Sequence, residues 1–141
     1  MNAKIRITAW VLILALASCS SGVEPALLWE ATLDPVLPSP VSGTVAAVTD
    51  AGRTQIGIQI REAEPGVAYR WRVDTGTCQA AGQLQGGLAS YPSLVPGSSG
   101  TASAEAIISA VFSSGSSYAA RVAREENGGD VVVACGVLEE R

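Results

Sequence analysis

The sequence predicts an all-β fold, a Greek-key β-sandwich or barrel, over residues 41–141. Apolar and polar residues alternate with period two in several short segments, which is the pattern of strands with one buried face. Clusters of glycine, proline, serine and asparagine separate these segments, as turns do. No amphipathic helix pattern appears in this region, and a chain of 141 residues has room for one such domain.

The first predicted strand is SGTVAAV, residues 42–48, and the second is TQIGIQIR, residues 54–61. In the second strand the three isoleucines share one face, since alternate residues of a strand point to the same side. A turn at Glu64–Gly66 leads into the third strand. The residues expected to point inward from this third strand are Val67, Tyr69, Trp71 and Val73.

Residues 79–100 are predicted to be irregular, because they carry no charge and are rich in glycine, serine and proline. Later strands are expected within 101–112, 118–124 and 131–138, the last two joined by a tight turn of the Asn-Gly type. In the middle one, Tyr118, Ala120 and Val122 share a face. Six strands are predicted, or up to eight if part of the irregular stretch and residues 26–33 also pair.

Residues 1–18 are predicted to be a lipoprotein signal peptide. Lys4 and Arg6 precede an uncharged, mostly apolar run of 11 residues, which is shorter than the roughly 20 that a spanning helix needs. The run ends in LASC, which resembles the bacterial lipoprotein signal in which the cysteine, here Cys19, is lipidated and becomes the mature N-terminus. The alternative is an ordinary secretory signal with a chance cysteine nearby.

Residues 19–40 are expected to be the lipidated N-terminus and a tether, because four prolines exclude a continuous helix or a central strand. Within it, Ala26–Leu33 is apolar enough to pack as a short strand, although Trp29 could instead sit at the membrane interface. Ser20 stands where an aspartate would favour inner-membrane retention, so we expect lipid anchoring at the outer membrane of the cell envelope, facing the periplasm or the cell surface.

Charge and composition exclude several classes of function. Removal of residues 1–18 lowers the number of basic side chains from 9 to 7 against 13 acidic ones, a formal net charge of −6. Such a chain has no basic stripe for nucleic acid. It contains no histidine, the commonest general base and zinc or copper ligand, so we expect neither an enzyme nor a bound metal or other cofactor.

Two cysteines remain after Cys19, namely Cys78 and Cys135, 57 positions apart. An even pair in an exported protein is most simply a disulfide. Such a bond would stabilise the fold by about 4 kcal/mol through the lost entropy of the unfolded chain. The alternative is a soft metal site made of two thiolates, which lacks both histidine and a CxxC spacing here.

The segments that contain these two cysteines resemble segments of a known protein family. WRVDTGTCQAAG (71–82) is similar to the segment of copper/zinc superoxide dismutases in which a His-Val-His strand runs into a cysteine loop. ACGVL (134–138) resembles that family's C-terminal Ala-Cys-Gly-Val, and YAARVA (118–123) resembles a strand that ends in another copper histidine. The resemblance covers about residues 41–138 and implies that family's Greek-key fold, with its loop cysteine paired to the C-terminal one.

The chain departs from the family where metal would bind. By this resemblance Arg72 and Asp74 occupy the places of the strand's two copper histidines, and Ala123 that of the later one. Residues 82–100 contain neither the histidines nor the aspartate that hold metal in the family, and Val132 replaces the arginine that guides superoxide. The resemblance therefore implies the scaffold without its redox chemistry.

Four charged residues form a candidate polar binding patch: Arg70, Arg72, Asp74 and Arg121. They are expected on the outward faces of their strands, either as solvated side chains, with Arg72 and Asp74 pairing weakly, or as a recognition patch in which Arg72 binds a carboxylate. Glu125, Glu126 and Asp130 surround a glycine-rich turn, and a solvated acidic hairpin is favoured there over a calcium site.

These observations favour a non-catalytic, membrane-anchored envelope lipoprotein whose domain serves as a protein-interaction or structural module. The expected partners are the membrane, through the N-terminal lipid, and an envelope protein. The alternatives are a residual metal-binding protein or related enzyme that uses non-histidine ligands, and a small-molecule or anion binder that uses the outward arginines.

Overall fold

Almost all of the folded chain is β-strand. The computed structural model describes residue 22 and residues 25–141, and this part of the chain contains eight strands and one short 3-10 helix. The elements are β1 (Leu27–Pro35), β2 (Ser42–Asp50), β3 (Arg53–Arg61), β4 (Tyr69–Gly76), β5 (Ala81–Leu84), η1 (Leu88–Ser90), β6 (Ala102–Ile108), β7 (Tyr118–Glu126) and β8 (Gly129–Glu140).

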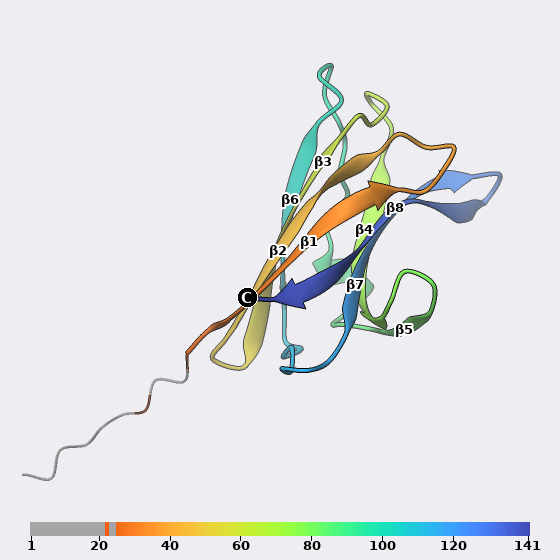
Figure 1. Cartoon of the computed structure of the whole chain (residues 1–141). Helices are drawn as coiled ribbons and strands as arrows, with labels where there is room; N and C mark the ends of the chain where they lie inside the picture. The colour runs from red at the N-terminus through yellow and green to blue at the C-terminus, as the bar shows by residue number, and fades with distance from the viewer. Residues whose placement is uncertain (1–21, 23–24) are drawn as a thin grey trace, which may run out of the picture.

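The strands form one antiparallel sheet in the order β5-β4-β7-β8-β1-β2-β3-β6, which curls into a half-barrel (Figure 1). The all-β prediction is confirmed, and the architecture is consistent with a β-sandwich. The expected two layers are, however, the two halves of one continuous sheet. They join where β1 pairs with β8 at two separate places, Trp29–Glu30 with Glu139–Glu140 and Asp34–Pro35 with Ala134–Cys135.

The folded domain begins in the segment expected to be a tether. Residues 27–33 of β1 pair continuously with residues 43–49 of β2, so the packing of this apolar stretch as a strand is confirmed. The boundary expected at residue 41 therefore moves back to Leu27, because β1 occupies an interior position in the sheet. The signal peptide and Cys19 lie outside the described residues. Among those described, no helix is long and apolar enough to span a membrane.

The stretch predicted to be irregular contains two small ordered elements, β5 and η1. It is also attached to the barrel, since the backbone N–H of Tyr69 donates to the carbonyl of Leu94 at 2.7 Å. The side chain of Leu94 is fully buried. Period-two analysis could not find this attachment, because one buried leucine in a run of small residues carries no periodic signal.

The core lies on the concave side of the sheet and is organised by an aromatic cluster. The ring of Trp29 meets those of Phe112 and Tyr118 edge-on, with centroids 5.9 and 5.3 Å away, and Phe112 stacks on Tyr118 at 4.1 Å. Trp29 is only 2% exposed, so its packing in the domain is confirmed. Tyr69, Trp71 and Val73 are buried as predicted, whereas Val67 is only half-buried.

Glycine at position 43 lets neighbouring strands approach closely. A Cβ atom added to Gly43 would overlap the backbone carbonyl oxygen of Gln59 on β3, whereas one added to Gly57 would meet nothing within 4 Å. Both glycines lie in the same sheet, so an alanine substitution at Gly57 is a matched control for the same substitution at Gly43.

We expect Gly43→Ala to lower the free energy of unfolding by about 1–3 kcal/mol, because the added methyl group must displace a paired strand. Gly57→Ala should leave stability unchanged or raise it by up to about 1 kcal/mol, since alanine loses less backbone entropy on folding. Urea unfolding of the two variants measures both values. Equal losses would show that the close approach at Gly43 is not constraining.

Candidate functional site

The four residues of the predicted polar patch come together on the outer face of β4 and β7. Arg72 stands directly opposite Arg121 in the antiparallel register, and Arg70 stands opposite Ala123. Asp74 lies two residues beyond Arg72 on the same face of β4. The structure therefore assembles the patch, but it divides the four side chains between the surface and the interior.

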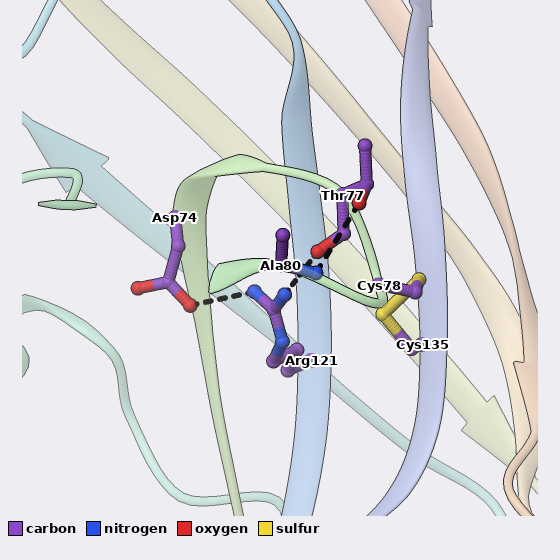
Figure 2. The surroundings of a disulfide bond; sticks show 6 residues. All are labelled: Asp74, Thr77, Cys78, Ala80, Arg121 and Cys135. Atoms are coloured by element: carbon purple, nitrogen blue, oxygen red, sulfur yellow. Dashed lines mark hydrogen bonds and ion pairs between the residues drawn. A yellow bond between two sulfur atoms is a disulfide. The ribbon is translucent and has the colours of Figure 1, made fainter. Parts of the chain in front are cut away.

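Asp74 and Arg121 are buried, contrary to the expectation that both are solvated outward residues. Their side chains are only 2% and 7% exposed. Arg121 donates from Nη1 to Oδ2 of Asp74 at 2.8 Å and from Nη2 to the carbonyl oxygen of Thr77, so its guanidinium group lies between the strand and the following turn (Figure 2). The turn covers what would otherwise be an exposed strand face, which is why alternation alone misplaced both residues.

The disulfide predicted between Cys78 and Cys135 is confirmed, and it holds this turn against β8. The two Cα atoms lie 5.9 Å apart. Within the turn, Thr77 and Ala80 exchange two backbone hydrogen bonds of 3.1 and 3.3 Å. The carbonyl group of Thr77, which accepts the hydrogen bond from Arg121, therefore belongs to a short loop. The disulfide fixes this loop at the next residue, Cys78.

Arg72 is the exposed partner of the buried pair. Its Nε donates to the same oxygen, Oδ2 of Asp74, at 3.2 Å, and 45% of its side chain is exposed. The predicted contact between Arg72 and Asp74 is present, but it ends on a buried carboxylate that Arg121 already binds. One carboxylate thus serves two guanidinium groups, which leaves this part of the site with a formal charge of +1.

The acidic residues around the β7–β8 turn form surface ion pairs. Arg70 donates to Asp130 at 3.2 Å and to Glu125 at 3.4 Å, with all three side chains well exposed. Arg124 binds Glu126, and this hydrogen bond raises the pKa of Arg124 above its ordinary value. Within residues 25–141, no three or more histidine, cysteine or acidic side chains come close enough to hold a metal ion.

A groove of about 530 Å³ runs over this outer face. Its strand side carries the three arginines Arg70, Arg72 and Arg121 together with Ala123 and Val132. The opposite wall comes from the β5–β6 connection and includes Leu88, Ala89 and Tyr91. Sequence reasoning missed this wall, because an uncharged glycine- and serine-rich stretch gives no signal of what it will cover.

Tyr91 is a titratable member of this wall. Its Oη donates to the carbonyl oxygen of Gln85 at 2.5 Å, and its ring meets that of Trp71 edge-on with centroids 4.9 Å apart. The pKa of Tyr91 is raised from 10.0 to about 12, mainly by burial of the phenol, and the negative charge of Asp74 contributes to this rise.

No protein-family model matches this chain, and no curated protein matches its sequence.

Replacement of Asp74 by asparagine should strongly destabilise the fold. The change keeps the shape of the side chain but leaves the buried Arg121 without its counter-charge, which costs about 3–5 kcal/mol. Asp130→Asn is the matched control, since it removes the same charge from the exposed pair with Arg70 and should change stability by less than about 1 kcal/mol. Chemical unfolding with the disulfide intact measures both; similar losses in the two variants would contradict the structural role of the buried pair.

Stability should fall at high pH through Tyr91. The folded-state pKa of about 12 lies above the ordinary value of 10.0, so the folded protein holds the phenol proton more tightly than the unfolded chain does. The resulting stabilisation is complete below pH 10 and is lost as the pH rises from 10 towards 12. Between pH 9 and 11 the melting temperature of the wild type should therefore fall more steeply than that of Tyr91→Phe. Parallel curves would exclude this contribution.

Proposed function

We propose that this protein is a non-catalytic lipoprotein of a bacterial cell envelope, with a binding or structural domain built on a superoxide dismutase-like Greek-key scaffold that lacks the metal chemistry. The observation that carries the proposal is the buried Asp74–Arg121 pair, because it occupies the strand face where the resemblance places the copper site. The proposal has three parts, the scaffold, the loss of chemistry and the lipid anchor.

The strand order and the disulfide support the scaffold. Of the segments on which the resemblance rests, residues 71–82 run from β4 through the disulfide loop into β5, residues 118–123 lie in β7, and residues 134–138 lie in β8. The connections β3–β4, β5–β6 and β6–β7 all join strands that are not neighbours in the sheet, as crossing connections in Greek-key folds do.

The residues of this face do not fit a copper or zinc ion. Arg72 is a permanent cation and Ala123 has no donor atom. Asp74 is the one carboxylate at the three corresponding positions, and two guanidinium groups already bind it. A metal cation there would have to displace Arg121 from a buried ion pair and lie beside two positive charges, an arrangement that Coulomb repulsion strongly disfavours.

Lipidation of Cys19 would place the domain close to the membrane. Seven residues separate Cys19 from Leu27, the first residue of β1, and a chain spans at most about 3.3–3.6 Å per residue. The start of β1 would therefore lie within about 30 Å of the lipid attachment. The net charge of −6 in the mature chain gives no attraction to anionic lipid, so the acyl chains would supply the attachment.

The metal content of the purified protein tests the proposal that the domain has lost its metal chemistry. The full chain is exported from a bacterial host grown with added copper and zinc, purified without chelator, and its metal is measured by mass spectrometry. We expect far less than one metal ion per folded, oxidised chain. One ion per chain would overturn the proposal in favour of a metal protein with non-histidine ligands.

The lipid anchor is tested by fractionation of the same host cells into membranes and soluble proteins. The wild-type chain should be recovered with the membranes, and Cys19→Ser should lose this association. Cys78→Ser/Cys135→Ser serves as the control, because it removes two other cysteines and should leave membrane recovery unchanged. Recovery of the wild type in the soluble fraction would overturn the lipid anchor.

A further inference from the structure

The groove over β4, β7 and β8 has an unbalanced positive charge at one point. Arg72 and Arg121 face each other directly across the two strands, and like charges in this position repel. A single oxygen of Asp74 accepts hydrogen bonds from both. The pairing relieves the repulsion but neutralises only one of the two arginines, so a formal charge of +1 remains at the groove floor.

Of the three arginines that line the groove, Arg72 is the one whose terminal N–H groups are not already used in hydrogen bonds to described residues. Arg121 uses Nη1 and Nη2 for Asp74 and Thr77 and is buried, and Arg70 uses the same two nitrogens for Asp130 and Glu125. Arg72 uses only Nε, and within the described part of the chain neither of its terminal nitrogens makes a hydrogen bond. These two nitrogens form a planar fork that matches the two oxygens of a carboxylate.

Apolar surface lies along the same groove. Leu88 is 62% exposed and Val132 is 36% exposed, although both are large apolar side chains. In the strand register Ala123 lies between Arg70 on β4 and Val132 on β8. Exposed apolar side chains gathered in a hollow, beside a charged group that has unused hydrogen-bond donors, are typical of ligand sites.

The loop wall of the groove is held in place in the protein itself. The indole Nε1 of Trp71 donates to the carbonyl oxygen of Pro92 at 2.7 Å, and the ring of Tyr91 packs edge-on against that of Trp71. The groove therefore exists before any ligand arrives, which lowers the entropy lost on binding.

The charges at the other end of the groove limit the ligand. Asp130 lines the groove and is 46% exposed, and its partner Arg70 also binds Glu125, so this end carries a formal charge of −1. A second anionic group on the ligand would be repelled there. The volume of about 530 Å³ falls in the range of small-molecule sites.

From these observations we propose that the groove binds a small monocarboxylate with an apolar body, whose carboxylate is held by Arg72 and whose apolar body lies against Leu88 and Val132. The proposal deepens the proposed function, on which it rests, by assigning a ligand class to the face that has no metal chemistry.

The probe is 4-phenylbutyrate, with 4-phenylbutyramide as the uncharged analogue of the same shape. The full chain, labelled with ¹³C at its methyl groups, is placed in lipid nanodiscs, or kept in solution if it does not associate with lipid, and titrated with each compound by NMR. Binding is thus read whether or not the chain is lipidated, and the metal content of the same sample is measured separately. A failure of binding and a failure of the proposed function are therefore distinguishable.

We expect saturable shifts of the Leu88, Ala123 and Val132 methyl signals with 4-phenylbutyrate, and at least about tenfold weaker binding of the amide. Arg72→Gln should weaken binding of the carboxylate by a similar factor. Arg61→Gln removes the same charge from an exposed position at the end of β3 and should bind within about twofold of the wild type. Arg72 is partly exposed and Asp74 keeps Arg121, so Arg72→Gln should fold.

Three outcomes would overturn the proposal. The first is the absence of saturable binding in a folded sample. The second is equal affinity of the wild type and Arg72→Gln, or of the carboxylate and the amide. The third is a set of equally large shifts at Leu28, Val48 and Ile107, exposed apolar residues of β1, β2 and β6 that do not line the groove.

Discussion

The buried ion pair between Asp74 and Arg121 is the interaction on which the outer face of this domain depends. A charge taken out of water must find a partner and hydrogen bonds, or it destabilises the fold by several kcal/mol. Here Asp74 receives hydrogen bonds from two arginines, and Arg121 uses its other terminal nitrogen for the carbonyl oxygen of Thr77. The pair thereby ties β4, β7 and the turn after β4 into one unit. The disulfide from Cys78 to β8 holds the same turn from its other side.

This arrangement makes one half of the sheet different from the other. In β2 and β3 the buried and exposed residues alternate almost strictly, because only the concave face is covered. In β7 five consecutive residues, Tyr118 to Val122, are buried, since the core covers one face and the disulfide turn covers the other. The disulfide turn covers this strand face and the buried ion pair fixes it. Such a face can hold a polar side chain in one position. Arg72 is that side chain, because it shares the buried carboxylate through Nε and lines the groove, and its terminal nitrogens make no hydrogen bond within the described part of the chain.

Several features of the fold could be predicted from the residues alone, for identifiable reasons. Ile56, Ile58 and Ile60 alternate with polar residues, so their common burial follows from strand geometry. Cys78 and Cys135 are the two cysteines that remain when Cys19 is assigned to the predicted lipoprotein signal, so their pairing followed from their number. For the candidate site, the sequence predicted which residues belong to it but not which of them are buried. Its four charged residues do come together, but alternation placed Asp74 and Arg121 in solvent because it describes a strand and not what later covers it.

The sequence by itself determined the class of fold, the disulfide and the residues of the core face, because these depend on local periodicity and on counting. Only the tertiary structure decided that Leu27–Pro35 is an interior strand, that an uncharged loop forms the wall of a groove, and that one arginine of three keeps free donor groups. These features arise between segments far apart in the chain: Asp74 and Arg121 are 47 residues apart, and Trp71 and Pro92 are 21 apart. Pairing at such separations depends on how the sheet curls and where the connections cross it, which no local pattern encodes.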